Sequence, residues 1–503
     1  MVGIILFFYL VLMLFNSSLF IFVFLPVCLT GFYFFKKQTN KTWVLWLNLC
    51  SIVFYGYWSL THLSILILSV TLNYFLARSM RRFGKLALAM GIIFNLSLLG
   101  YFKYSNFLIE QINFGFGTNL DLIKIVLPIG ISFFTFQQIA YLADLYKRKA
   151  ETASYNRYLF FISFFPQLIA GPIVHHEEIF KQLKKRRHFL KGLAIGFSFF
   201  CIGLFKKVVI ADHVALTANE VFGYAEAGGA PTFLEAWYGA LAYTLQIYFD
   251  FSAYSDMAIG LAYMFGLRLP QNFSSPYKAT SIVDFWRRWH ITLSRFLKDY
   301  LYIPLGGNRK GHIRKYINVI ITMLIGGFWH GASWNFVLWG GLHGVFLFIN
   351  QWSNDTFKVK SPKIVGWSLT FLLVVFAWVP FRATNIEGFL GIWKGMIFMN
   401  GVTLPESMSI LNLSKGTLLP SVNTDMGLTI AVLLLICYFL PNTSEIFRKH
   451  NVTLSTKGYS HTMDKSKYIN WRPTFLWSML IVFMFTISIL KLNNPSDFLY
   501  FQF

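Results

Sequence analysis

Long apolar runs alternate with short basic loops along almost the whole chain. Each run holds about 20 residues, which is the length that an α-helix needs to cross a lipid bilayer. The runs predict helices at 14–35, 43–59, 60–77, 86–102, 121–143, 190–211, 235–267, 316–334, 365–381, 386–400, 426–441 and 472–491.

This pattern predicts an all-α, polytopic integral membrane protein. We expect a single membrane domain over residues 1–503, with N-terminal spans in 14–104, a core at about 120–400 and C-terminal spans in 426–491. The start of the chain lacks the basic residues and the cleavage site of a removable signal peptide. Translation from Met1 and translation from Met13 are both compatible with this start.

The basic residues predict which loops are cytoplasmic, because Lys and Arg are enriched on that side of a membrane. Four loops carry them: 36–42, 79–85, 147–157 and 181–189. The weakly charged loop 103–120 should face outward. Segment 158–174 is apolar yet has basic loops on both sides, so a single crossing does not fit. We therefore expect a re-entrant segment, bent at Pro166 and at Gly171–Pro172, that lines a cavity.

Composition agrees with a membrane protein. The 503 residues are 56% hydrophobic and only 13% charged, whereas soluble proteins carry about 25% charge. The net charge of +23 lies in loops between apolar runs, which favours membrane topology over nucleic-acid binding. The four cysteines lie in or beside apolar runs without metal-ligand spacing, so we predict neither a disulfide framework nor a metal site.

The strongest candidate for chemistry is His330, in the sequence GGFWHGASW of Gly326–Trp334. An ionisable side chain at membrane depth is a functional-site hypothesis by default. Gly327 and Gly331 leave little bulk near the ring. The alternative is a histidine of the core that is satisfied by a carbonyl group. His343 is a second imidazole in the apolar run that follows.

Two carboxylates interrupt the long apolar run 235–267. Asp250 and Asp256 are six residues apart, so an unbroken helix would place them on different faces. We expect a break near Ser252–Ser255, or separate partners for the two carboxylates. Structural pairing with arginines later in the chain is the expected role for both.

Residues 281–304 predict an amphipathic helix at the interface or in a cavity mouth. Two oppositely charged pairs are four residues apart, Asp284 with Arg288 and Arg295 with Asp299. His290 and Ser294 share the other face. The basic loop that follows indicates that this end of the segment is cytoplasmic.

Four of these stretches carry a resemblance to a known family: FFPQLIAGPI, QIYFDFSAYSDMAIG, FWRRWHITLSRFLKDYLYIPLGGNR and GGFWHGASWNFVLWGGLHG. They resemble the membrane-bound O-acyltransferase superfamily, and more narrowly its bacterial branch, which includes alginate O-acetyltransferase and the D-alanyl transfer protein of teichoic acid synthesis. The match runs in order from about Leu14 to Trp378. It implies a ring of tilted helices with re-entrant segments around a thin core and a central tunnel. It also implies that His330 is catalytic and that His290 is a second, supporting residue.

The residues suit this chemistry independently, because acyl transfer to a hydroxyl needs a base near pH 7 and imidazole is the natural choice. We expect His330 to be the general base and His290 to orient or polarise the donor, with Arg288 and Asp299 holding its helix. Further supporting residues would be Asp250, Asp256, Trp329, Asn335 and His343.

The resemblance implies acetyl-CoA or a related cytoplasmic acyl thioester as donor, with no permanently bound cofactor. It also implies extracytoplasmic partner proteins, a polysaccharide acceptor such as alginate or another exopolysaccharide, and a multi-pass location in the bacterial inner membrane. The enzymatic alternative is D-alanyl transfer to teichoic acid from a carrier protein. A different class is a membrane transporter, which inverted repeats would favour; the sequence does not reveal such repeats.

Overall fold

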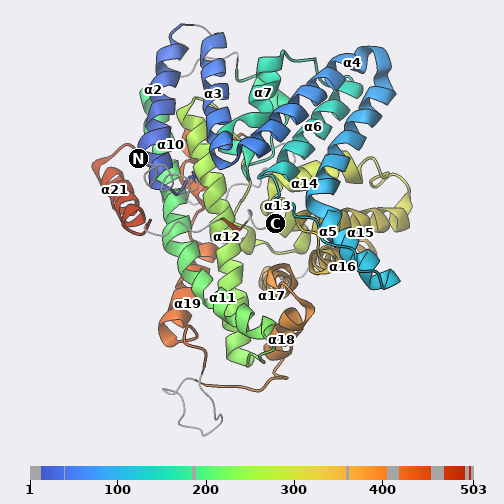
Figure 1. The fold of residues 1–503 in the computed structure, drawn as a ribbon. Helices are drawn as coiled ribbons and strands as arrows, with labels where there is room; N and C mark the ends of the chain where they lie inside the picture. The colour runs from blue at the N-terminus through green and yellow to red at the C-terminus, as the bar shows by residue number, and fades with distance from the viewer. Residues whose placement is uncertain are drawn as a thin grey trace.

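The computed structural model describes residues 13–38, 40–183, 189–357, 362–404, 418–454, 469–492 and 498–499 (Figure 1). Within these ranges the chain is helical and holds no β-strand, only an isolated bridge between Pro270 and Leu454. The predicted all-α class is confirmed. Three helical stretches are long and apolar enough to cross a membrane, Leu60–Phe116, Lys191–Glu226 and Lys363–Arg382.

The first half of the chain contains η1 (Phe20–Phe24), α2 (Leu25–Lys36), α3 (Asn40–Trp58), α4 (Leu60–Leu99), η2 (Gly100–Tyr104), α5 (Ser105–Phe116), α6 (Ile131–Tyr146), α7 (Tyr155–Ser163), α8 (Phe165–Leu168), α9 (His176–Phe180), α10 (Phe189–Phe205), η3 (Lys206–Ala211), α11 (Asp212–Glu226) and α12 (Phe233–Met264). The second half contains η4 (Pro276–Lys278), α13 (Ile282–Arg288), α14 (Ile291–Leu297), η5 (Lys298–Tyr302), α15 (Gly311–His330), α16 (Trp334–Phe357), α17 (Lys363–Arg382), α18 (Ile386–Met396), α19 (Thr424–Phe439), α20 (Thr443–Ile446), η7 (Arg448–His450) and α21 (Phe475–Leu490).

Three of the four basic loops of the N-terminal half lie at one end of the molecule, and residues 184–188 of the fourth lie outside the described ranges. The α2–α3 connection, the sharp bend inside α4 and the α6–α7 connection all lie at the top of Figure 1. The bend falls at Gly84, whose φ of 42° lies in the left-handed region that favours glycine. This arrangement agrees with the shared side that the charges of these loops predict.

Two boundaries in this half were predicted wrongly. The expected outward loop 103–120 is largely helical, because α4 continues through the π-helical turn η2 into α5. The expected span 121–143 is helical only from Ile131, and the chain before it is extended. Gly130 starts α6 with φ 71°, and a Cβ there would press on the carbonyl oxygen of Leu168. The close approach of segment 158–174 therefore sets where α6 begins.

Segment 158–174 is buried in protein along its whole length, as irregular backbone at membrane depth requires. Helix α7 ends at Ser163, the chain bends at Phe164, and the short α8 contains Pro166. A second bend follows at Gly171, where a Cβ would collide with the backbone of Gln167. The predicted bends therefore lie within two residues of the observed ones.

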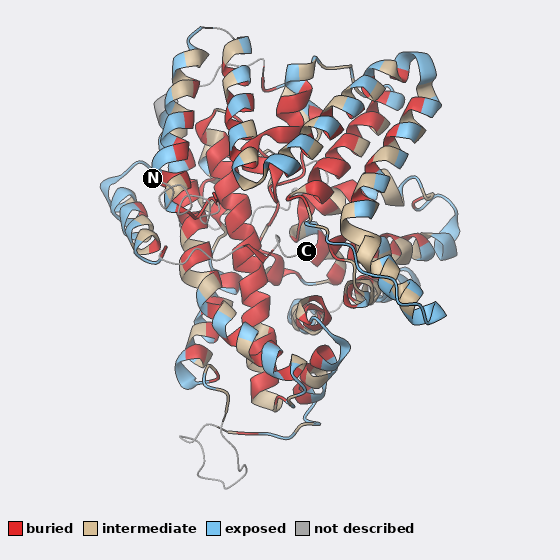
Figure 2. Ribbon diagram, viewed as in Figure 1, coloured by how far each residue is buried: buried red, intermediate tan, exposed pale blue. Residues whose placement is uncertain are grey.

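The long helix α12 runs through the centre of the molecule and is buried along most of its length (Figure 2). It begins with a capping box, in which the Thr232 backbone N–H donates to Glu235 Oε2 at 2.8 Å. Helix α10 packs closely against it, because Gly196 faces Gly260 and a Cβ on either would meet the other's carbonyl oxygen. Small residues allow such close helix contacts in membranes. The expected break at Ser252–Ser255 is absent, because α12 is continuous from Phe233 to Met264.

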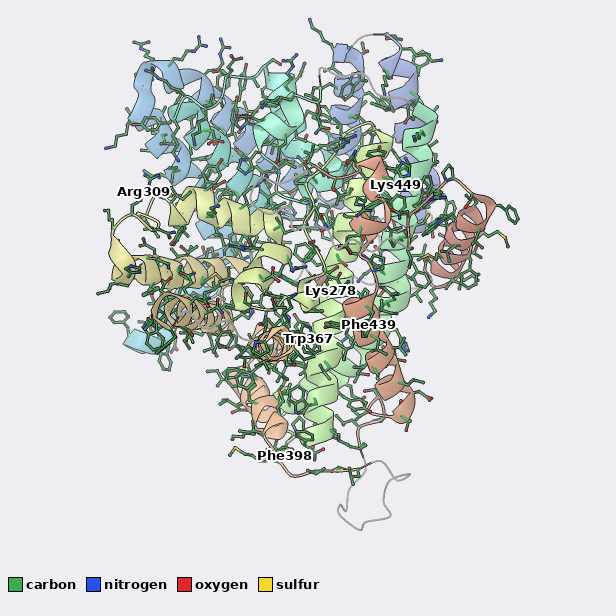
Figure 3. All side chains as sticks on the ribbon, turned by 180° about the vertical axis from the view of Figure 1, so that it is seen from behind. Lys278, Arg309, Trp367, Phe398, Phe439 and Lys449 are labelled. Carbon is green, nitrogen blue, oxygen red and sulfur yellow. The ribbon has the colours of Figure 1, made fainter. Side chains whose placement is uncertain are left out.

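Helices α13–α18 are arranged differently from the central helices. In Figure 1, the long α12 runs steeply down the view with α11 beside its lower part, α15 lies across the view and α17 is seen nearly end-on. The expected span 386–400 is wrong, because α18 ends at Met396 and is too short to cross a bilayer. On the opposite face (Figure 3), Lys278 Nζ donates to the Leu440 carbonyl at 2.9 Å, which ties the end of α19 to the turn η4.

Candidate active site

His330 is the last residue of α15, and its side chain is buried. The helix ends there because Gly331 is extended, with φ −163°. Gly327 and Gly331 act mainly in packing: a Cβ on Gly327 would collide with the Phe336 carbonyl, and one on Gly331 with the Phe336 ring. The glycines therefore bring the start of α16 against the end of α15, and this contact sets the position of His330.

Aromatic rings enclose the His330 imidazole. The ring centroids of Trp329, Trp339 and Phe381 lie 5.0, 5.1 and 5.3 Å from it, each at a steep angle to the imidazole plane. These three rings hold the imidazole in one place.

Lys103 binds the end of the helix that carries His330. Its Nζ donates to the carbonyl oxygens of Trp329 and His330 at 2.6 and 2.9 Å. The last carbonyls of a helix lack partners within the helix and carry its negative dipole end, so a cation is stabilising there. Lys103 was not among the site residues predicted from the sequence. The available signal was a single lysine in the apolar stretch around it, at a depth where charge is costly.

His343 lies on α16 behind Trp339, fully buried. The centroids of His343 and Trp339 are 4.9 Å apart, so both His343 and His330 contact the same indole. The Trp286 indole N–H donates to His343 Nδ1 at 3.2 Å. A continuous aromatic path therefore joins α13 to His330 through His343 and Trp339.

Cavities lie along α15 and just beyond its end. One of about 610 Å³ is lined by residues 315–323 of the helix, including Val319 and Met323, and by Trp286. A second of about 620 Å³ lies beyond the helix end and is lined by residues 332–335. A small one of about 40 Å³ is lined by Lys103, Trp329 and His330 and has room for a water molecule. The lining of the first cavity reaches Met323 on α15 and that of the second begins at Ala332, so His330 lies between the two linings along the chain and itself lines the small cavity.

The first cavity has a basic lining, with Arg287, Lys298 and Lys315 against the single carboxylate of Asp355. Lys315 Nζ lies 2.6 Å from Asp355 Oδ2, and the Tyr316 hydroxyl donates to the same oxygen at 2.9 Å. The hydrogen bond from Lys315 holds the pKa of the Asp355 carboxyl below its usual range. The carboxylate is therefore ionised near neutral pH, and the lining keeps a net positive charge.

The second cavity is lined by polar groups and by an exposed indole. Glu110, Gln111 and Glu387 contribute to its wall, together with Trp334 and Asn335. The Asn335 amide donates to the Ala383 carbonyl at 2.7 Å, which joins the start of α16 to the end of α17. The role of Asn335 in this structure is therefore to hold one wall of the cavity.

His290 lies at a break between two short helices and not on the face of one long helix. Helix α13 ends at Arg288 and α14 begins at Ile291, with His290 between them at φ 40°. The predicted single amphipathic helix over 281–304 is therefore wrong. The imidazole is buried against Phe251, with centroids 4.8 Å apart, and its Nδ1 lies 3.0 Å from Asn272 Oδ1.

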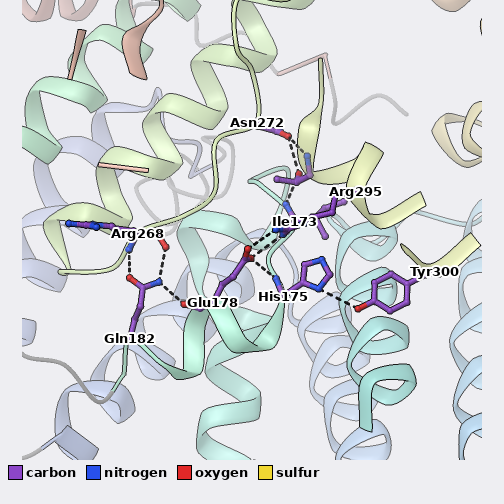
Figure 4. Close-up of polar contacts among 9 residues, drawn as sticks. Ile173, His175, Glu178, Gln182, Arg268, Asn272, Arg295 and Tyr300 are labelled. Carbon is purple, nitrogen blue, oxygen red and sulfur yellow. Dashed lines mark hydrogen bonds and ion pairs between the residues drawn. The ribbon is translucent and has the colours of Figure 1, made fainter. Parts of the chain in front are cut away.

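One predicted charge pair near His290 is confirmed and the other is wrong. Arg288 Nε donates to Asp284 Oδ2 at 3.0 Å. Arg295 does not pair with Asp299; its guanidinium donates to the two carboxylate oxygens of Glu178 at 2.6 and 3.1 Å (Figure 4). The two-point contact with the segment after α8 is more specific than an i,i+4 pair. Asp299 lies one turn away, next to Tyr300 in η5.

Asp250 and Asp256 have separate partners, which was one of the two predicted alternatives. These partners are lysines earlier in the chain. Lys207 Nζ lies 2.7 Å from Asp250 Oδ1, and Lys206 Nζ lies 2.7 Å from Asp256 Oδ2. Both lysines belong to the π-helical turn η3, packed beside α12. Asp212 adds a second carboxylate 3.0 Å from Lys207. The predicted pairing with later arginines is wrong, and we call these five residues the ion-pair cluster.

His330 is a buried imidazole in a chain whose described residues are helical and include helices long and apolar enough to cross a membrane. Residues 37–387 match the membrane-bound O-acyltransferase (MBOAT) family. The chain belongs to this family and is an O-acyltransferase, as its motifs predicted.

The chain is similar to named relatives along nearly its whole length. It is 42% identical to the peptidoglycan O-acetyltransferase of Helicobacter pylori, with 98% of each chain covered. It is 39% identical to the probable alginate O-acetylase AlgI of Pseudomonas putida, with 98% of this chain and 100% of the relative covered. The similarity to the teichoic acid D-alanyltransferase of Bacillus subtilis is weaker, at 27% identity over 50% of this chain and 68% of the relative.

Proposed function

We propose that this enzyme transfers acetyl groups from a cytoplasmic acyl thioester to hydroxyls of an exported cell-envelope polymer, with His330 as general base. The observation that carries the proposal is the place of His330, buried at the end of α15, with the lining of one large cavity ending at Met323 before it and the lining of another beginning at Ala332 after it. The relatives matched over almost the full chain are named for O-acetylation, which supports acetyl over other acyl groups.

The two substrates would approach His330 from opposite sides. The cavity along residues 315–323 of α15 includes Lys315 in its lining, near the basic loop that predicts a cytoplasmic face. Its positive lining suits an anionic donor such as acetyl-CoA. The cavity beyond Gly331 has amide, hydroxyl and carboxylate groups and the exposed Trp334, which suit an acceptor rich in hydroxyls.

In the proposed reaction, His330 takes the proton of the acceptor hydroxyl as its oxygen attacks the thioester carbonyl carbon. A carbon–oxygen bond forms and the carbon–sulfur bond breaks. The leaving thiolate then receives the proton from the imidazolium, which restores the neutral base. His290 would assist the donor. Arg288 would hold His290 in place through the connection between α12 and η4, since the Arg288 guanidinium donates to the Ser274 carbonyl at 3.4 Å.

The polymer would be a polysaccharide or peptidoglycan, reached through extracytoplasmic partner proteins. The enzyme would lie as a multi-pass protein in the bacterial inner membrane.

Mass spectrometry of the exported polysaccharide and of peptidoglycan, from cells with and without the gene, tests the proposal. We expect O-acetyl groups to disappear from one polymer and to return with the intact gene but not with His330→Ala. Loss of D-alanine esters in place of acetyl esters would support the D-alanyl transfer alternative. Unchanged polymers would contradict both reactions.

A further inference from the structure

The side-chain oxygen of Asn272 lies at the centre of a buried hydrogen-bond network beside His290. Three groups contact this one oxygen: the Thr292 backbone nitrogen at 3.3 Å, the Thr292 hydroxyl at 2.9 Å and His290 Nδ1 at 3.0 Å. Asn272, His290 and Thr292 are each at most 1% exposed. Buried polar atoms must satisfy one another, so the identity of each donor can be worked out.

The direction of the hydrogen bond between the Thr292 hydroxyl and Asn272 follows from the other partner of the hydroxyl. The backbone N–H of Ile173, in the segment after α8, donates to Thr292 Oγ1 at 3.0 Å (Figure 4). A backbone N–H can only donate, so the hydroxyl accepts there and directs its own proton to Asn272. The Thr292 backbone N–H also donates to Asn272. The atom of Asn272 that receives both is therefore its carbonyl oxygen.

The orientation of the Asn272 amide shows which nitrogen of the His290 ring carries the proton. The Asn272 amide nitrogen donates to Ser255 Oγ at 3.3 Å on the other side, which agrees with this orientation. An oxygen that accepts from Thr292 cannot donate to His290. The His290 Nδ1 therefore carries a proton and donates it to Asn272. In a neutral imidazole the second nitrogen, Nε2, then carries the lone pair.

We propose that Asn272 is a positioning residue that holds His290 as the Nδ1–H tautomer, so that Nε2 acts only as a hydrogen-bond acceptor. The inference rests on the proposed function and deepens it. Polarising the thioester carbonyl would need an N–H at Nε2, so that half of the expected role is excluded for the neutral ring. His290 instead orients the donor by accepting a hydrogen bond, for which the amide N–H groups in the arm of acetyl-CoA are suitable partners.

The same network makes the tautomer depend on distant parts of the chain. Thr292 is held by Ile173, and the rings of Phe251 and Phe273 lie 4.8 and 6.4 Å from the imidazole. The segment after α8 is therefore linked to His290 indirectly, through Thr292 and Asn272.

Nitrogen-15 NMR of the intact protein with labelled histidine tests the tautomer without any assay of the reaction. The His290 signals are assigned by their loss in His290→Ala. We expect a protonated Nδ1 and an unprotonated Nε2 at neutral pH, and a protonated Nε2 would overturn the proposal. Because the spectrum needs no substrate, this result stands apart from the success or failure of the proposed function.

Variants of Asn272 test the consequence with acetyl-CoA as donor. Asn272→Leu removes the acceptor, so we expect kcat/KM to fall about tenfold or more, mainly through KM for the donor. Asn272→Asp keeps an acceptor oxygen and should retain most of the activity that Asn272→Leu loses. Asn73→Leu is the matched control, since Asn73 is also fully buried and hydrogen-bonded, to Asn95 in α4. Activity of folded Asn272→Leu equal to that of this control would overturn the positioning role.

Discussion

Two groups of buried polar residues differ in how their partners are arranged. The ion-pair cluster beside α12 matches each lysine with a carboxylate at 2.7 Å. The histidine cluster of His290, His330 and His343 is surrounded mainly by aromatic rings, and His330 lines a cavity. Lys207, Asp250 and Asp256 are buried, as are all three histidines, whereas Lys206 and Asp212 are partly exposed. Burial of an ionisable group alone therefore does not indicate catalysis: matched charges stabilise a fold, whereas a ring that lines a cavity can exchange a proton with a substrate.

The largest expected effect is at His330. A general base contributes about 10²–10⁴-fold to rate, so His330→Ala should abolish acetylation while the protein still folds. His330→Gln keeps hydrogen-bonding capacity but cannot act as a base near neutral pH. Both variants should melt close to the parent temperature and be inactive. If the folded Gln variant acetylated at near the parent rate, His330 would not be the general base, and the contrast between a catalytic histidine cluster and a structural ion-pair cluster would fail.

The ion-pair cluster should show the opposite behaviour. Lys207→Met leaves Asp250 buried without its cation, which costs about 3–5 kcal/mol. We expect a lower melting temperature and yield, with unchanged activity per folded molecule. The double variant Lys207→Met, Asp250→Leu should recover part of the lost stability, because it removes the unpaired charge. A loss of specific activity as large as that of His330→Ala would mean that this cluster also takes part in the reaction.

A smaller effect is expected at His290, which sharpens the comparison within the histidine cluster. His290→Ala should raise KM for the thioester donor and leave measurable turnover, because the base is still present. Steady-state kinetics with acetyl-CoA would separate KM from kcat. Complete loss at both histidines, with both proteins folded, would contradict the division of roles.

The smallest effect is expected at Lys103, a partly buried cation that binds carbonyls and not a carboxylate. Lys103→Met keeps the length of the side chain but removes both hydrogen bonds to the end of α15. A displaced His330 should lower the rate about tenfold, since small errors in position are costly in catalysis. Lys103→Arg, which can still donate to both carbonyls, is the control. Full activity in Lys103→Met would show that the glycine contacts alone hold His330.

Much of the fold could be predicted because lipid allows few structures. A span needs about 20 apolar residues with its backbone bonded internally, and this requirement is visible in the sequence. The bent segment 158–174 was also predictable, from basic loops on both sides of an apolar run. The helix boundaries at Ile131 and His290 were not, because each depends on a contact with a segment far away in the chain.

The sequence by itself determined the membrane class and the family, and it supplied the prediction that His330 is catalytic, since each rests on local pattern. Only the tertiary structure decided the partners: Asp250 pairs with Lys207, Arg295 with Glu178, and Lys103 with the end of α15. The physical reason is that a buried charge binds whichever opposite charge or dipole the helix packing brings within about 3 Å. That packing depends on small residues such as Gly196 and Gly260, whose contacts no local pattern reveals.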